Sequence, residues 1–215
     1  MKIKFSELAL AELESRFTGL RNTIRPVKCE DQYVGNTLDI VKCKKIPDNF
    51  RQAVEERGAE KCLILILESP HVDEFRDANN PGPAKGVTGR NIARYFDRVE
   101  GLKLYSSKGY GLILMNAIQY QCSLGEPTDC FRDDIFHSVW NNGGESDFLE
   151  RLQSAFRRGD IIANCCTKGD KKPYLRDLVQ KAITEIDNND FGQVLRRNHP
   201  SCWFAPKRQK TLPLP

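Results

Sequence analysis

Four short apolar runs of this chain each end in a polar loop, and these loops carry most of the residues that could do chemistry. A carboxylate, an amide and an imidazole follow three of the runs: Glu68 after 62–67, Asn116 after 111–115 and His199 after 193–195. Such groups can move protons and stabilise a leaving group. The remaining run, at 160–163, leads into the loop Asn164-Cys165-Cys166-Thr167-Lys168-Gly169.

The apolar runs are the strands that must position these side chains. Unbroken runs of this length are typical of parallel strands that are buried on both faces. Ligands bind beyond the carboxyl ends of the strands in open α/β sheets, so we expect Glu68, Asn116 and His199 to converge on one pocket. Helical patterns separate or precede the runs at 5–17, 47–57, 88–99, 130–140, 147–157 and 173–187.

This β-α-β order, with crossovers long enough for parallel pairing, predicts an α/β fold. We expect residues 61–215 to form a three-layer αβα sandwich around a central four-stranded parallel sheet. Residues 1–60 are expected to form a helical or irregular extension packed on that core. The mixed stretch at 21–50 gives no clear assignment.

Composition describes an ordinary globular protein of 215 residues, with 40% hydrophobic and 29% charged residues. No apolar stretch is long enough to cross a bilayer, and the N-terminal segment lacks the apolar core of a signal peptide. We therefore expect a cytoplasmic monomer that does not bind membranes. The net charge of +4 is modest, but no acidic residue occurs from Phe191 onward. The basic residues there predict either a rim that contacts phosphates or a solvated tail.

Eight cysteines are present, and no two of them form a C-x-x-C pair. Zinc ribbons and common iron–sulfur sites rely on such spacing. We therefore predict neither a metal site nor any other cofactor.

The loop motifs, taken in order, resemble those of the uracil-DNA glycosylase superfamily. The motifs are E-S-P-H after the first run, G-x-x-G at the start of a helix, L-M-N after the second run and H-P-S-C-W after the last. The resemblance covers roughly residues 61–204. It implies a monofunctional DNA glycosylase that hydrolyses the N-glycosidic bond of a flipped-out uracil-like or bulky modified pyrimidine base and leaves an abasic site.

The resemblance also implies roles for individual residues. Glu68 would orient the attacking water and stabilise the cationic sugar, and His199 would stabilise the departing base. Asp73 and Glu74 are reserve carboxylates in the same loop. The residues expected to hold the base are Ser69, His71, Ala84, Asn116 and Gln119. The residues expected to contact DNA are Lys85, Gly86, Arg90, Lys168, Ser201, Trp203, Lys207 and Arg208.

Three of these assignments have plain structural alternatives. Glu68 could cap or pair locally, while a water bound elsewhere does the work. Asn116 could simply occupy a strand-end turn. Trp203 could pack in the core instead of filling the gap left by the flipped base.

Three positions depart from the family pattern. Ser69 stands where the family has aspartate, asparagine or alanine, and His71 replaces a tyrosine that bars thymine. Ala84 stands where an aromatic ring stacks on uracil. Losing a stacking ring weakens the grip on a small base. The departures therefore predict a bulky modified pyrimidine as substrate, such as those in some phage DNAs, and hence a role in defence against phage.

Two other functions fit the same residues. The substitution at Ser69 favours a DNA-binding module that kept the fold and lost turnover. A cysteine hydrolase could instead use Cys165 or Cys166 with His199, although neither cysteine has a recognisable orienting group.

Overall fold

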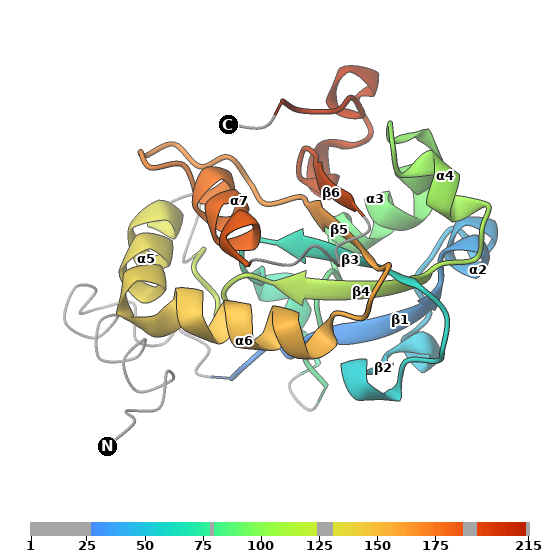
Figure 1. Cartoon of the computed structure of the whole chain (residues 1–215), viewed down its shortest axis with the longest axis horizontal. Helices are drawn as coiled ribbons and strands as arrows, with labels where there is room; N and C mark the ends of the chain where they lie inside the picture. Colours follow the sequence, from blue (N-terminus) through green and yellow to red (C-terminus); the bar gives the residue numbers. More distant parts are fainter. Residues whose placement is uncertain (1–26, 78–79, 124–130, 187–192, 214–215) are drawn as a thin grey trace.

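Six strands form one mixed sheet in the computed structural model, which describes residues 27–77, 80–123, 131–186 and 193–213. The strand order is β2-β1-β4-β3-β5-β6 (Figure 1). The four predicted parallel strands are confirmed as β3 (Cys62–Leu67), β4 (Gly111–Asn116), β5 (Ile161–Asn164) and β6 (Gln193–Arg196).

Both faces of β3 are buried, which explains its unbroken apolar sequence. Cys62, Ile64 and Ile66 pack into one hydrophobic cluster, and the alternating residues Leu63 and Leu65 pack into another on the opposite face. Side chains alternate along a strand, so a run that faces two cores must be apolar at every position.

The sheet is larger than the predicted central four-stranded parallel sheet, because antiparallel strands extend it at one edge. β1 (Gln32–Asn36) pairs antiparallel with β4 and with the two-residue strand β2 (Gln52–Ala53). The described part of the first sixty residues therefore extends the same sheet. β1 is short and mostly half-buried, so its sequence carries little of the apolar pattern that marks the central strands.

The prediction of a helix at 47–57 is wrong. The segment forms two 3-10 turns, Asp48–Phe50 and Val54–Glu56, with β2 between them. Pairing of β2 with β1 holds the middle of the segment extended. The predicted helix at 5–17 lies outside the described residues.

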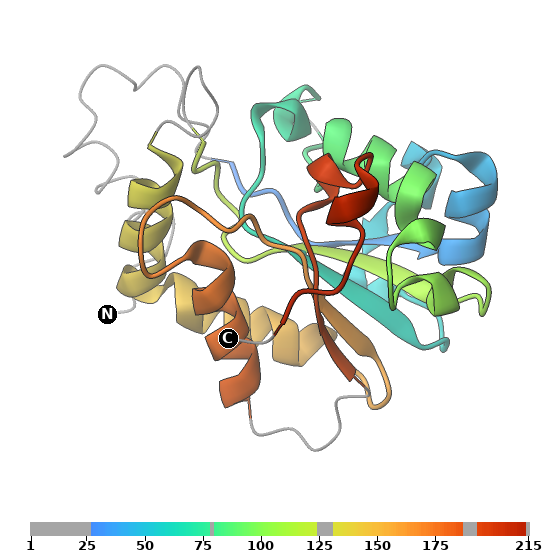
Figure 2. The ribbon, with the colours of Figure 1, turned by 90° about the horizontal axis from the view of Figure 1, so that it is seen from above.

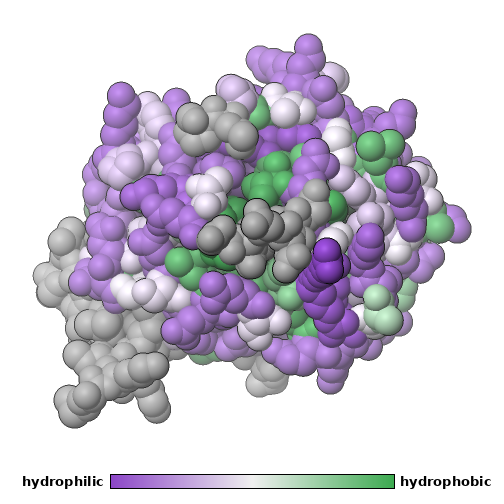
Figure 3. All heavy atoms as spheres, viewed as in Figure 1, coloured by the Kyte–Doolittle hydropathy of each residue, from purple (hydrophilic) through white to green (hydrophobic). Residues whose placement is uncertain are grey.

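Helices cover both faces of the sheet (Figure 2). On one face lie α5 (Arg132–Val139), α6 (Glu145–Ala155) and α7 (Leu175–Glu185), close to their predicted bounds. The outer surface on this side is largely hydrophilic (Figure 3). The other face carries α3 (Val87–Tyr95), which was predicted, together with α2 (Thr37–Cys43) and α4 (Lys103–Ser106), which were not. Within the described ranges, no helix is long and apolar enough to span a membrane.

Candidate active site

A cavity of about 310 Å³ opens where the carboxyl ends of β3, β5 and β6 meet the start of α3. We call it the Glu68 cavity. Eight of the residues singled out in the sequence, including the two reserve carboxylates, line it together: Glu68, Ser69, His71, Asp73, Glu74, Gly86, His199 and Ser201. The structure thus brings together residues that lie as far apart in the sequence as 68 and 201, as expected for loops at one edge of a parallel sheet.

Glu68 and His199 face each other in this cavity. The Nε2 atom of His199 lies 3.5 Å from Oε2 of Glu68. The same carboxylate oxygen accepts a hydrogen bond of 3.2 Å from the backbone N–H of Thr167, which follows β5. The loops after three parallel strands therefore fix one carboxylate against one imidazole.

The turn after β6 sets the orientation of the His199 ring. Its Nδ1 accepts a hydrogen bond of 3.3 Å from the backbone N–H of Ser201 and lies 2.8 Å from the Ser201 hydroxyl. Because Nδ1 is an acceptor, the proton of a neutral ring sits on Nε2, which faces Glu68. Asn91 of α3 holds the turn by donating to the carbonyl oxygens of Pro200 and Ser201, at 3.0 and 2.9 Å.

Burial controls protonation at the cavity. It lowers the pKa of His199 below its ordinary value of 6.5, although the nearby Glu68 carboxylate partly opposes this effect. Burial also raises the pKa of Glu74 to about 8. At neutral pH the cavity therefore holds a neutral imidazole and a predominantly protonated Glu74.

The G-x-x-G motif has a steric explanation. A Cβ atom at Gly89 would lie 1.8 Å from the carbonyl oxygen of Ala84, and one at Gly86 would lie 2.6 Å from Oδ2 of Asp73. The loop can therefore approach the first turn of α3 only if glycine occupies position 89, whereas a Cβ at position 86 would displace the Asp73 side chain. This close approach places Gly86 in the wall of the Glu68 cavity.

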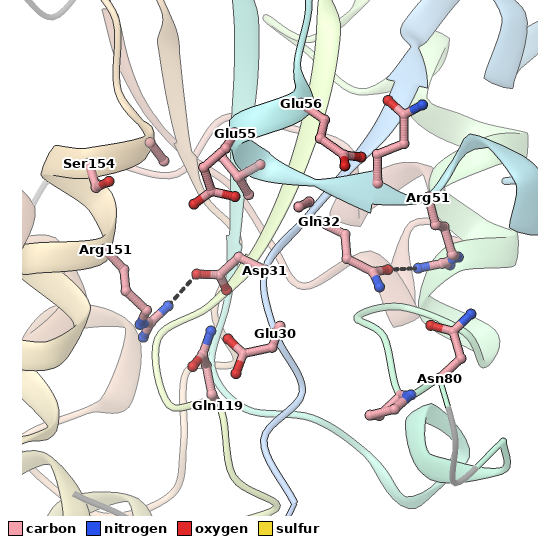
Figure 4. A pocket seen from close by; sticks show the side chains of 15 residues that line it. Glu30, Asp31, Gln32, Arg51, Glu55, Glu56, Asn80, Gln119, Arg151 and Ser154 are labelled. Carbon is pink, nitrogen blue, oxygen red and sulfur yellow. Dashed lines mark hydrogen bonds and ion pairs between the residues drawn. The ribbon is translucent and has the colours of Figure 1, made fainter. Parts of the chain in front are cut away.

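Three of the predicted base-holding residues do not line the cavity. Asn116 is fully buried, and its amide nitrogen lies 3.6 Å from the sulfur of Cys29. Ala84 packs in the hydrophobic cluster below α3, and its backbone N–H donates to Glu74 at 2.9 Å. Gln119 lines a different hollow, beside Asp31 (Figure 4). The expected convergence is thus correct for Glu68 and His199 and wrong for Asn116.

Trp203 corrects the prediction of an apolar wedge. Its side chain is fully buried, and its indole N–H donates to the carbonyl oxygen of Asn198 at 2.7 Å. The next residue, Phe204, is 63% exposed. The 3-10 turn Pro200–Cys202 directs Trp203 into the core and leaves Phe204 at the surface.

The other predicted DNA contacts lie around the cavity or at the surface. Lys85 and Arg90 border a neighbouring hollow, and the Lys85 ammonium donates to the carbonyl of Asn80. Lys168 is exposed, with its ammonium 4.1 Å from the centre of the Tyr174 ring. Lys207 and Arg208 are exposed on the 3-10 turn Pro206–Arg208.

The buried thiols argue against the cysteine hydrolase. Cys165 and Cys166 are fully buried behind β5. Burial raises the pKa of Cys165 to about 12 and that of Cys166 well above its ordinary value. Since the thiolate is the nucleophile, neither side chain is activated at neutral pH.

Sequence reasoning missed several residues of the wall. Arg132 lines the cavity at the start of α5, where it pairs with Asp133 at 2.9 Å. Ser123 and Thr167 also line it. Thr167 lies in a loop that the strand pattern already pointed to, whereas nothing near Ser123 or Arg132 marks them.

Comparisons with protein-family models, with curated proteins and with solved structures find no significant match to this chain.

Proposed function

We propose that this chain is a monofunctional DNA glycosylase that hydrolyses the N-glycosidic bond of a base rotated out of the DNA stack. The observation that carries the proposal is the carboxylate of Glu68 facing the Nε2 of His199 in a cavity of about 310 Å³. This volume is at the small end for ligand sites, which suits one nucleotide and excludes a duplex. A base must therefore leave the helix to reach these groups.

The two side chains supply complementary parts of the reaction. Glu68 accepts a proton from water as the water oxygen attacks C1′ of the sugar, and its negative charge stabilises the cationic sugar. The bond from C1′ to the base nitrogen breaks, and its electron pair leaves with the base. The Nε2–H of neutral His199 donates a hydrogen bond to the developing negative charge on that base.

The surface beyond the cavity supports binding to DNA. Phe204 projects from the turn that also carries His199, and Lys207 and Arg208 are exposed directly after it. Apolar side chains that enter a base step and cations that contact phosphates are common partners in proteins that distort DNA. We assign Phe204, in place of the buried Trp203, as the residue that fills the gap left by the base.

The lining favours a base that carries a polar substituent. No Phe, Tyr or Trp among the described residues lines the cavity. Its wall instead includes Ser123 and Thr167, which carry hydroxyl groups, and Arg132, which carries a guanidinium group paired with Asp133. A pyrimidine with a bulky polar group, as in some phage DNAs, would find hydrogen-bond partners there that plain uracil cannot use. A role in defence against phage follows if such DNA is the substrate.

The test is release of free bases from DNA that contains uracil, hydroxymethylated pyrimidines or glycosylated pyrimidines, followed by detection of abasic sites. Glu68→Gln keeps the shape of the side chain and removes its charge. It should lower turnover by about two orders of magnitude or more without weakening DNA binding. Asp39→Asn makes the same charge change at an exposed position of α2 and serves as the matched control.

Two results would reject the proposal. If the chain binds DNA but releases no base, it is a non-catalytic binding module. Base release that is unchanged in Glu68→Gln would place the chemistry elsewhere.

A further inference from the structure

A second and larger hollow, of about 610 Å³, lies at the antiparallel edge of the sheet (Figure 4). We call it the Asp31 hollow. It is bordered by β1, the 3-10 turn Val54–Glu56 and α6, and it shares no lining residue with the Glu68 cavity. The residues that matter below are Glu30, Asp31, Glu55, Glu56, Gln119 and Arg151.

The hollow carries more negative charge than its own cations neutralise. Four carboxylates line it, together with Arg51 and Arg151. Arg151 is already occupied, because it pairs with Asp31 at 2.6 Å and with Asp147 at 2.8 Å. Arg51 donates to Gln32 and to the carbonyl of Pro83, both at 2.8 Å.

The remaining carboxylates are available to a ligand. Within the described part of the chain, Glu30, Glu55 and Glu56 form no ion pair or side-chain hydrogen bond. In Figure 4 the carboxylates of Glu30, Asp31 and Glu55 surround the same space.

Gln119 adds an observation that is independent of the acidic residues. Its side chain is 1% exposed, and neither its Oε1 nor its Nε2 makes a hydrogen bond within the described residues. Its amide nitrogen lies toward Asp31 (Figure 4). A buried acceptor without a donor is unfavourable, and it marks a place where a ligand with N–H groups gains a hydrogen bond.

The free groups of the hollow define the chemistry of its ligand. Apart from the buried Nε2 of Gln119 and Nε of Arg51, which also have no hydrogen-bond partner, they are acceptors and anions. The ligand must therefore be positively charged and rich in donors. No group of three or more His, Cys, Asp or Glu side chains in the described ranges is arranged to hold a metal ion. The carboxylates are instead spread around an open hollow, which suits a ligand with separated charges.

We propose that the Asp31 hollow binds an aliphatic diamine or polyamine, with one ammonium group beside Glu55 and another beside Glu30 and the Oε1 of Gln119. Ammonium groups offer three donors each and are compact enough to reach such acceptors. The site is independent of the proposed DNA chemistry, since an acidic hollow repels phosphates.

Calorimetric titration of the full chain with 1,4-diaminobutane and with spermidine tests this site at physiological salt. We expect saturable binding with one ligand per chain. Glu55→Gln should weaken it by about tenfold, because it removes one charge-assisted hydrogen bond. Asp39→Asn changes the net charge equally but does not line the hollow, and it should leave affinity unchanged.

Gln119→Leu separates a ligand-binding role from a structural one. It removes the buried acceptor and keeps a side chain of similar size. Affinity should fall, while the thermal midpoint should change little, because no described residue loses a bond to Oε1 and only the interaction of the amide nitrogen with Asp31 is removed. The proposal is overturned by no saturable binding, by equal weakening in Glu55→Gln and Asp39→Asn, or by unchanged affinity in Gln119→Leu. Displacement of the diamine by an equimolar amount of Mg²⁺ would also overturn it, in favour of a metal site.

Discussion

Glu74 provides a direct test of how burial shapes the wall of the Glu68 cavity. Its side chain is 3% exposed. Burial is the main reason why the pKa of this carboxyl rises from an ordinary 4.5 to about 8, and the nearby charge of Glu68 raises the pKa further. Hydrogen bonds from the Ala84 N–H at 2.9 Å and the Cys29 thiol at 3.6 Å oppose the rise only in part. Glu74 is therefore protonated at neutral pH in the folded chain.

A raised pKa makes the folded state less stable as pH rises. Below pH 4.5 the folded and unfolded chains both hold the proton, so Glu74 then makes its full contribution to the free energy of unfolding. Between pH 4.5 and 8 the unfolded chain releases this proton and the folded chain keeps it. The free energy of unfolding therefore falls with pH across this window, and it levels off above the pKa of the folded state.

The magnitude follows from the two pKa values. Each tenfold difference in proton affinity is worth about 1.4 kcal/mol, so the loss from Glu74 alone is about 1 kcal/mol at pH 5.5 and about 4 to 5 kcal/mol at pH 8.5. Glu74→Gln keeps an acceptor for the Ala84 N–H and cannot ionise. The free energy of unfolding of Glu74→Gln, taken relative to that of the original chain, should therefore increase by about 3 kcal/mol from pH 5.5 to pH 8.5.

Urea unfolding from pH 5.5 to 8.5 measures this difference. Tryptophan fluorescence can follow it, because Trp140 and Trp203 are both buried. Asp39→Asn is the control, because it removes a carboxyl at an exposed position of α2 outside the cavity. If Glu74→Gln and the original chain keep a constant difference in stability over the whole range, the carboxyl does not titrate near 8 and the reasoning is refuted.

Three further predictions concern the proposed reaction. Because burial lowers the pKa of His199 below 6.5, the imidazole stays neutral as pH falls through that value. We expect kcat/KM to decline only at lower pH, and an acid limb at or above 6.5 would contradict this. Replacing Arg208 and Lys210 with alanine should weaken binding to all DNA sequences and reduce the slope of log affinity against log salt by about one per lost phosphate contact. An unchanged slope would show that this segment is a solvated tail. Phe204→Ala should slow base release from duplex DNA and leave single-stranded DNA unaffected, because only a duplex has a gap to fill. Leu104→Ala, an equally exposed apolar truncation on α4, is its control, and equal rates on duplex DNA for both variants would remove Phe204 from this role.

The sequence by itself determined the central strands and the loops that follow them. A strand buried on both faces must be apolar at each position, so β3 and β4 are visible as continuous runs. Parallel strands place their carboxyl ends at one edge of the sheet, and this places Glu68 and His199 together. The edge strand β1 escaped notice because it is short and only partly buried, with no continuous apolar run.

Only the tertiary structure decided which way individual side chains point. Asn116 pairs in register with Leu67, one residue before Glu68, so the alternation along the strands turns Asn116 and Glu68 to opposite faces. Trp203 and Phe204 are neighbours in the sequence and equally apolar, yet one is fully buried and the other exposed. Local patterns specify which segments become strands, because burial acts on every residue of a run. The direction in which a single loop residue points depends on its tertiary contacts. Asn91, for example, holds the turn before Trp203 by donating to the carbonyl oxygens of Pro200 and Ser201, and no local sequence pattern encodes such a contact.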